Sequence, residues 1–250
     1  MAIKVPAERP KTKGIQIAEK GRAETGEAIS LDARLMMQLL AFGGCTDPAP
    51  LVAALEAAGI PGVLYEDFND PYGVALLTYH TDPDFFIDTV RPLLRQAPFS
   101  ELELKPGYTM TGRTYSIGYE SDLEDVLLRR PIRHACTPEW PWAVWYPLRR
   151  KGGFERLPGD EQRKLLMEHG GIGMAYGRAD HGHDIRLACH GIDRNDNDFV
   201  VALVGKALPP LSKIVQHMRK TKQTAEFMDQ MGPFFVGRAL WQHAVYPELV

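Results

Sequence analysis

Hydrophobic and polar positions follow the same order twice along this chain. In the first half, runs typical of strands alternate with runs whose apolar residues recur at helical spacing. An Ala/Leu-rich helix followed by Gly59 shows this clearly, because glycine suits the left-handed residue that ends a helix. The pattern predicts, in order, a strand, a helix, two strands, a helix and a strand at residues 35–42, 49–58, 62–67, 69–77, 83–94 and 108–119.

The second half repeats this order with a longer insertion between its two central strands. The elements predicted there lie at residues 143–148, 157–170, 173–178, 197–204, 209–219 and 234–242. Both halves thus predict the β-α-β-β-α-β order of a ferredoxin-like module, in which helices cover one face of an antiparallel sheet. We expect an α+β fold of two tandem modules, residues 31–130 and 131–250, in a dimeric α/β-barrel-like arrangement behind a flexible N-terminal arm of residues 1–30.

The predicted helix at residues 157–170 carries a single histidine. Pro158 suits the first helical turn and Gly170 suits the left-handed stop, so His169 is expected at the C-terminal end, held in a fixed direction. A neutral imidazole held in this way suits axial ligation of haem iron, with its second nitrogen oriented by a neighbouring acceptor. The alternative is a histidine that interacts only with the negative end of the helix dipole.

Composition narrows the class of protein. The chain has 250 residues, 44% hydrophobic and 24% charged, with a net charge of -3 and both signs mixed. No basic face favours nucleic acid and no polybasic cluster favours lipid, so a small-molecule ligand is expected. The first thirty residues lack the apolar core of a signal peptide, and no later apolar run reaches membrane-spanning length. Cys45, Cys136 and Cys189 are widely spaced, which favours a reducing compartment, and together these features predict a cytoplasmic enzyme.

The histidines and glycines of residues 169–190 could also indicate a zinc site or a dinucleotide-binding site. His169, His181, His183 and His190 lie within a short stretch that invites a zinc site, but the chain has no HExxH pair and no CxxC pair. The glycines at residues 170–173 follow a predicted helix rather than a strand, so they do not form a dinucleotide-binding fingerprint.

Several ordered motifs resemble the chlorite dismutase family across about residues 34 to 240. They are LPGDEQRKLLMEHG at residues 157–170, WYP at 145–147, GID at 191–193, DFVV at 198–201, MRKT at 218–221 and GPFFVG at 232–237. Within the family, a Tyr-Pro strand followed by basic residues resembles the coproheme decarboxylase branch.

The resemblance implies a role for each matching residue. His169 falls on the proximal ligand of the iron, and Tyr146 falls on the tyrosine whose radical abstracts hydrogen from the substrate propionates. The residues implied to bind propionates are Arg150, Tyr115, and the pair Arg219 and Thr224, and Glu226 is the candidate acceptor that orients His169. Coproheme carries four propionates, and arginine and hydroxyl groups are suitable donors for carboxylates.

Each position also has a plain alternative. Tyr146, flanked by apolar neighbours, suits a half-buried core tyrosine. Arg219 suits a cation near a helix end, and residues 149–151 suit a solvated turn.

The residue on the other side of the iron departs from the family pattern. In chlorite dismutases it is an arginine thirteen residues beyond the proximal histidine, which here lands on Gly182, whereas counting back from the GID turn lands on Asp184. We favour His183, because a histidine that titrates near neutrality suits proton transfer with peroxide. His134 is a second candidate, and Arg186 would instead support chlorite chemistry. Otherwise the histidines of this segment are polar residues of a surface hairpin.

The function implied is a haem-dependent oxidoreductase. The first hypothesis is a decarboxylase that uses hydrogen peroxide to convert coproheme, iron coproporphyrin III, to haem b. The alternative is a haem-binding or haem-sensing protein with peroxidase or chlorite-degrading activity. Family resemblance further implies a homo-oligomer, commonly a pentamer.

Overall fold

The computed structural model describes residues 14–248. Its strands are β1 (Glu19–Arg22), β2 (Ala28–Leu31), β3 (Met36–Gly43), β4 (Gly62–Asp67), β5 (Val74–His80), β6 (Glu103–Leu104), β7 (Met110–Thr114), β8 (Trp142–Arg150), β9 (His183–Ala188), β10 (Phe199–Gly205), β11 (Met228–Met231) and β12 (Phe235–His243). Its α-helices are α1 (Ala49–Ala58), α2 (Arg91–Leu94), α3 (Arg130–Cys136), α4 (Gly159–Arg178), α5 (Leu208–Met218) and α6 (Lys222–Phe227). Short π- or 3-10-helical turns occupy Phe86–Val90, Phe99–Glu101, Pro106–Tyr108, Asp125–Arg129 and Phe154–Arg156.

Two modules of the predicted order make up the fold. The first runs β3, α1, β4, β5, α2, β7 and the second runs β8, α4, β9, β10, α5, β12. Strand pairing gives the orders β7-β3-β5-β4 and β12-β8-β10-β9, the same arrangement in both sheets. This confirms the ferredoxin-like repeat, although β7 is shorter than the strand expected at residues 108–119.

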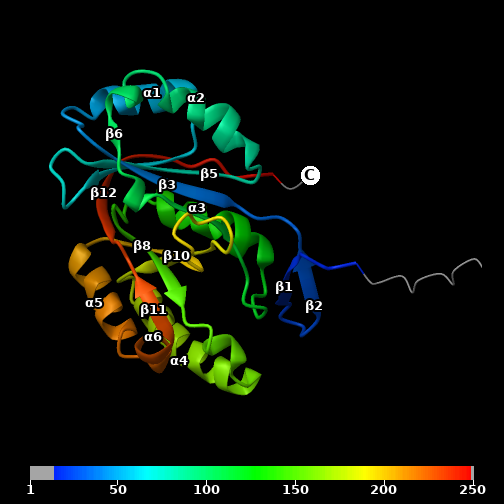
Figure 1. Cartoon of the computed structure of the whole chain (residues 1–250). Coiled ribbons are helices and arrows are strands. Elements are labelled where there is room, and N and C mark those ends of the chain that lie inside the picture. The colour runs from blue at the N-terminus through cyan, green and yellow to red at the C-terminus, as the bar shows by residue number, and fades with distance from the viewer. Residues whose placement is uncertain (1–13, 249–250) are drawn as a thin grey trace, which may run out of the picture.

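The two sheets pair along both of their edges. Strand β4 pairs with β12 from Gly62 to Asp67, and β7 pairs with β9 through Arg113 and Thr114, all antiparallel. Eight strands therefore close into a ring (Figure 1). Closure removes free edges from these strands and separates an inner face from an outer face.

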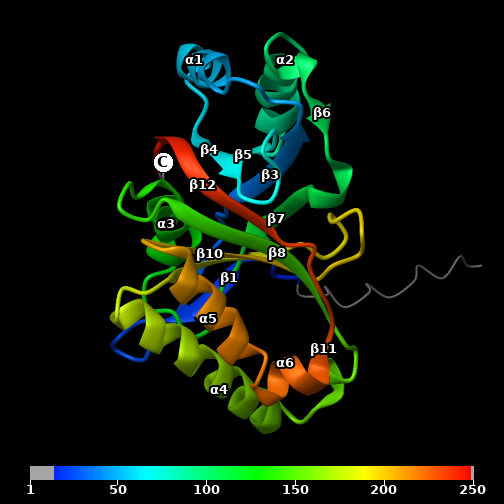
Figure 2. The same cartoon turned by 90° about the vertical axis from the view of Figure 1, so that its left-hand side faces the viewer.

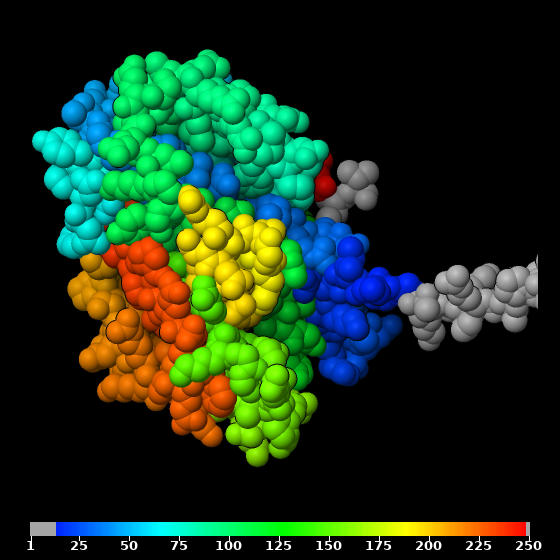
Figure 3. Space-filling model, in the orientation of Figure 1, coloured from blue at the N-terminus to red at the C-terminus, as the bar shows by residue number. Residues whose placement is uncertain are grey.

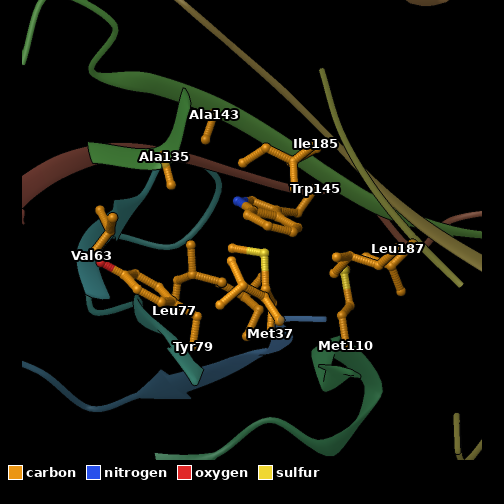
Figure 4. Close-up of a cluster of buried hydrophobic side chains, with 14 of the residues drawn as sticks. Met37, Val63, Leu77, Tyr79, Met110, Ala135, Ala143, Trp145, Ile185 and Leu187 are labelled. Atoms are coloured by element: carbon orange, nitrogen blue, oxygen red, sulfur yellow. The ribbon is translucent and has the colours of Figure 1, made fainter. Parts of the chain in front are cut away.

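The inner face of the ring is filled by apolar side chains. Trp145, Met37 and Tyr79 point toward one another there, together with residues from both modules (Figure 4). Residues Leu127 and Ile132, in the segment that includes α3, belong to the same cluster. The interior is therefore a packed core.

The outer faces carry the remaining helices. Helices α1 and α2 cover the first module, while α4 and α5 cover the second on the opposite side of the molecule (Figure 2). Because side chains alternate along a strand, β8 sends Trp145 inward and Val144 and Tyr146 outward, toward α5. The second outer face is where the sequence predicted a site.

Helix α4 differs from the prediction. It continues past Gly170 to Arg178, so His169 lies in its middle, and the strand expected at residues 173–178 is helical. The glycines weaken a helix, but the C-terminal half is anchored by packing. Tyr176 packs in the outer-face cluster and its hydroxyl lies 2.9 Å from Nδ1 of His217 on α5.

The N-terminal segment is also partly folded. Within the predicted arm, β1 and β2 form a hairpin held by Glu19, whose carboxylate accepts hydrogen bonds from Arg34, Arg113 and the Ser116 amide. Residues 19–31 thus belong to the folded structure, and residues 1–13 of that arm lie outside the described residues. Across residues 14–248, no helix has the length and apolar character needed to span a membrane.

Candidate functional site

The candidate site lies between α4 and the outer face of the second sheet. A row of side chains crosses three strands of this face, because Arg186 on β9 is opposite Val201 on β10, which is opposite Tyr146 on β8. The ring of Phe234 stacks on Tyr146 with 4.7 Å between centroids. The face thus combines apolar surface with one guanidinium and one phenol.

His169 occupies the face of α4 that also carries Leu165 and Tyr176, four residues before it and seven after it. Leu165 is buried and Tyr176 packs in the outer-face cluster, so His169 lies on the side of α4 that faces the second sheet. Its Nδ1 atom lies 3.4 Å from Oγ1 of Thr221. Burial lowers the pKa of His169, and the charge of Arg150 lowers it further. A neutral imidazole is the form that binds a metal ion.

Thr221 determines which nitrogen of His169 carries the proton. Its hydroxyl donates to the carbonyl of Met218 at 2.8 Å, so toward His169 the oxygen is an acceptor. The same oxygen accepts from the amide of Thr224, because Thr221 is the N-cap of α6. His169 therefore holds its proton on Nδ1, and Nε2 keeps a free lone pair for a ligand bond.

Glu226 was expected to orient His169, but its side chain points to Lys222 and not to the imidazole. Its side chain is exposed and its carboxylate lies 4.0 Å from the ammonium of Lys222. Its carbonyl accepts a hydrogen bond from Lys151. The sequence does contain a pattern that indicates the position of Thr221. Threonine is a favoured N-cap residue, and α6 begins directly after it.

Arg150, at the end of β8, places a largely buried guanidinium between two aromatic rings. Its Cζ atom lies 4.1 Å from the centroid of Phe154 and 4.9 Å from that of Phe199. Nη1 reaches the carboxylate of Glu155 at 3.2 Å, but Nε is buried and has no hydrogen-bond partner within residues 14–248. A buried donor without a partner is costly, so this guanidinium suits an anionic ligand.

The loop between β9 and β10 lies at the surface, where it is yellow in Figure 3, and it contacts the end of β8. Arg149 donates to the carbonyl of Asp196 in this loop at 2.7 Å. The carboxylate of Asp198 accepts from the backbone amide of Arg150 at 2.7 Å. These bonds fix the backbone that carries Arg150.

Tyr115 lies beside this arginine group, directly after β7. Its ring centroid is 5.6 Å from that of Phe199, and the guanidinium of Arg186 lies 5.9 Å from its centroid. Burial raises the pKa of Tyr115, so it stays a protonated phenol and a hydrogen-bond donor.

Arg219 and Thr224 line a hollow of about 260 Å³ together with residues of β11. Arg219 follows the last turn of α5 and Thr224 lies in the first turn of α6. The structure thus brings this predicted pair together at one opening, separate from the aromatic group around Arg150.

Tyr146 is 5% exposed on the wall facing α4. Burial raises its pKa, and the carboxylate of Asp184 raises it further. The phenol of Tyr146 therefore stays protonated across the physiological range.

His183 and His134 lie on the inner side of β9, and His169 lies beyond the outer side of the same sheet. His183 alternates with Asp184 and shares its side with Ile185, and its ring stacks on Trp140 at 3.7 Å. Nδ1 of His134 donates to the carbonyl of Asp184 at 2.8 Å. This placement argues against either histidine as the group above an iron, and it leaves Asp184 and Arg186 on the outer face of β9.

The described part of the chain holds no group of three or more His, Cys, Asp or Glu side chains arranged to share a metal ion. The four histidines considered for zinc are dispersed over α4, β9 and the segments around β9. A single histidine ligand to a porphyrin iron does not require such a group, because the macrocycle supplies the other ligands.

Known proteins that are similar to this chain include members of one family and proteins described as haem-binding. Residues 99–240 match the family model described as chlorite dismutase. A protein of Natronomonas pharaonis whose name describes it as haem-binding is 28% identical over an alignment of 124 residues, and the match covers 47% of this chain and 20% of that longer protein.

Solved structures share the fold. A haem-binding protein from Thermus thermophilus aligns with a TM-score of 0.63 and 20% identity, covering 83% of this chain and 93% of that one. A chlorite dismutase from Candidatus Nitrospira defluvii in complex with imidazole aligns with a TM-score of 0.62 and 12% identity, covering 84% of this chain and 92% of that one.

Proposed function

This chain belongs to the chlorite dismutase family, and we propose that it binds coproheme between α4 and the outer face of β8 to β10 and decarboxylates it with hydrogen peroxide. His169 would hold the iron through Nε2, because Nδ1 is engaged with Thr221. The haem-binding names of the relatives from Natronomonas pharaonis and Thermus thermophilus support the class of ligand.

The observation that favours coproheme over haem b is the presence of two separate groups of carboxylate-binding side chains. Arg150, with its buried and unpartnered Nε, forms one group with Tyr115. Arg219 and Thr224 form the other, at a hollow of their own. Coproheme presents four propionates and haem b presents two, so a site with several such donors suits the more anionic porphyrin.

Each turnover converts one propionate to a vinyl group. The propionate carboxylate loses carbon dioxide, one proton and two electrons, and hydrogen peroxide takes up these two electrons, that proton and one proton from solvent to give two waters, so atoms and electrons balance. When bound, the coproheme iron supplies the redox centre at which peroxide is reduced.

The chain's own residues hold and oxidise the propionate. Arg150 would anchor one carboxylate through its unpartnered Nε, and Arg219 would anchor another at its own hollow. Tyr146, a protonated and buried phenol on the facing wall, would give up its hydroxyl hydrogen and recover one from the propionate side chain. Phe234, stacked on Tyr146, helps to exclude water from this phenol.

A second candidate function is chlorite degradation or general peroxidase activity in a haem-binding protein. The residue that would serve it is Arg186, which lies on the same outer face of the sheet as Tyr146, although its guanidinium is paired with the carboxylate of Asp184.

Incubation of purified protein with coproheme and stoichiometric peroxide, followed by mass spectrometry of the porphyrin, distinguishes the two. We expect loss of one and then two carboxyl groups, and we expect Tyr146→Phe to bind coproheme without forming these products. Unchanged coproheme with the wild-type protein, or equal product with Tyr146→Phe, would overturn the proposed decarboxylase.

A further inference from the structure

Asp184 places a carboxylate on the outer face of β9, the face on the side of α4. The residue is opposite Leu203 on β10, which is itself opposite Val144 on β8, and both of these apolar side chains belong to the outer-face cluster. The Asp184 side chain is 50% exposed toward the open side of this face. It therefore lies one cross-strand row from Tyr146, on the wall that faces α4.

The charge of the Asp184 carboxylate acts on a residue of β8 and on a residue of α4. Burial raises the pKa of Tyr146 on β8, and Asp184 adds to that rise. Burial and Arg150 lower the pKa of His169 on α4, and Asp184 opposes that change. The same carboxylate thus raises the pKa of both groups, one on the sheet and one on the helix.

Arg186, two residues along the same face, is paired with two carboxylates. Its Nε lies 3.0 Å from Oδ2 of Asp184, and its Nη2 lies 4.0 Å from Oε1 of Glu120. The carboxylate of Glu120 is fixed in turn, because it accepts hydrogen bonds from the amides of Ile117 and Tyr119 at 3.0 Å. Arg186 is therefore held from both sides.

An unpaired guanidinium facing a bound iron would attract anions, whereas a paired one offers little net charge. We propose that Asp184, by neutralising Arg186 on the outer face of β9, selects neutral ligands of the iron such as hydrogen peroxide over anionic ones such as chlorite or azide. This inference rests on the proposed haem site and names the class of co-substrate that the site accepts.

Titration of ferric haem-loaded protein with azide and with imidazole at pH 8 tests the inference, because azide is an anion there and imidazole is mostly neutral. We expect Asp184→Asn to bind azide about tenfold more tightly than wild type, measured from the Soret shift, with imidazole affinity within about twofold. Glu120→Gln is the matched control, and its longer distance to Arg186 predicts a smaller gain. Unchanged azide affinity in Asp184→Asn, or equal gains for azide and imidazole, would overturn the inference.

The double variant Asp184→Asn/Arg186→Gln tests whether a gain in azide affinity comes from the charge of Arg186 or from a general change in the structure of the site. Removal of both charges should return azide affinity to within about threefold of wild type, because the released cation is gone. A double variant as tight as Asp184→Asn would contradict the inference.

A different result would show that the proposed haem site is wrong. If the wild-type protein forms no Soret band, or forms one that His169→Ala leaves unchanged, the haem site itself is wrong. If the band depends on His169 but azide affinity is the same in wild type and Asp184→Asn, only this further inference fails.

Discussion

Nδ1 of His169 lies 3.4 Å from Oγ1 of Thr221, whose own proton is directed to the carbonyl of Met218. The imidazole thus has a neutral hydroxyl as its partner, and not the carboxylate that the sequence led us to expect at Glu226. A hydroxyl acceptor fixes the tautomer and the ring direction without adding negative charge to the ligand.

Thr221→Val should weaken haem binding by about tenfold, because the ring of His169 loses the acceptor that orients it. Thr221→Ser keeps the hydroxyl and should restore affinity. Titration of apoprotein with haem, followed at the Soret band, measures both. Equal affinity of the valine and wild-type proteins would show that Thr221 does not orient the ligand.

Arg150→Gln should lower coproheme affinity by about tenfold or more, because a charge-assisted bond to a propionate is lost. Arg149→Gln is the matched control, since Arg149 is bonded to carbonyls of Asn195 and Asp196 in the neighbouring loop. Fluorescence quenching on coproheme addition gives both affinities. A larger loss in the Arg149 variant would contradict the assigned role of Arg150.

Stability should fall in mild acid because of His134. Burial lowers the pKa of His134 to about 4, against about 6.5 in the unfolded chain, and the nearby groups include His183, Asp184 and Arg133. Between these values the unfolded state binds more protons, so the free energy of unfolding decreases as pH falls from about 6.5 to about 4, by about 3 kcal/mol in total.

Urea unfolding at pH 7 and pH 4.5 measures this difference, with His134→Asn as the control that lacks the titrating ring. The variant should lose less stability between the two conditions than the wild-type protein. An identical loss in both proteins would remove His134 as the cause.

Gly170→Ala should stabilise the protein by about 1 kcal/mol, because the residue is inside α4 and an added Cβ meets nothing within 4 Å. Gly112→Ala should have the opposite effect, since its Cβ would lie 2.7 Å from Cβ of Leu187 where β7 meets β9. Thermal unfolding of both variants measures the contrast. Destabilisation by Gly170→Ala would contradict the helical conformation of that residue.

Local pattern predicted most of the fold. The spacing of apolar residues predicted the element order of both ferredoxin-like modules, but the strand expected at residues 173–178 is helical and β9 takes its place in the second module. Gly59, with a positive φ of 62°, does end α1. Ring closure was not predictable in detail, because the pairing of β4 with β12 joins residues far apart in sequence. The length of α4 was predicted wrongly because Gly170 was interpreted as a stop, whereas contacts of Tyr176 with the sheet and α5 keep the helix intact.

The candidate site was only partly predictable. His169, Tyr146, Arg150 and Arg219 came from motifs, and their roles stay predictions. The position of His183 could have been read from the alternation His-Asp-Ile-Arg-Leu, which places it on the side of the buried Ile185 and leaves Asp184 and Arg186 outside. The pairing of Arg186 with Glu120 was beyond sequence analysis, because it joins separate segments in space.

The role proposed for His169 is to bind porphyrin iron between α4 and the outer face of the second sheet. The most direct measurement is the Soret spectrum and porphyrin affinity of His169→Ala beside the wild-type protein, with circular dichroism to verify that both are folded. The account predicts a folded variant whose Soret band is shifted or lost and whose affinity falls by at least about tenfold. A folded variant with an unchanged Soret band and unchanged affinity would contradict it.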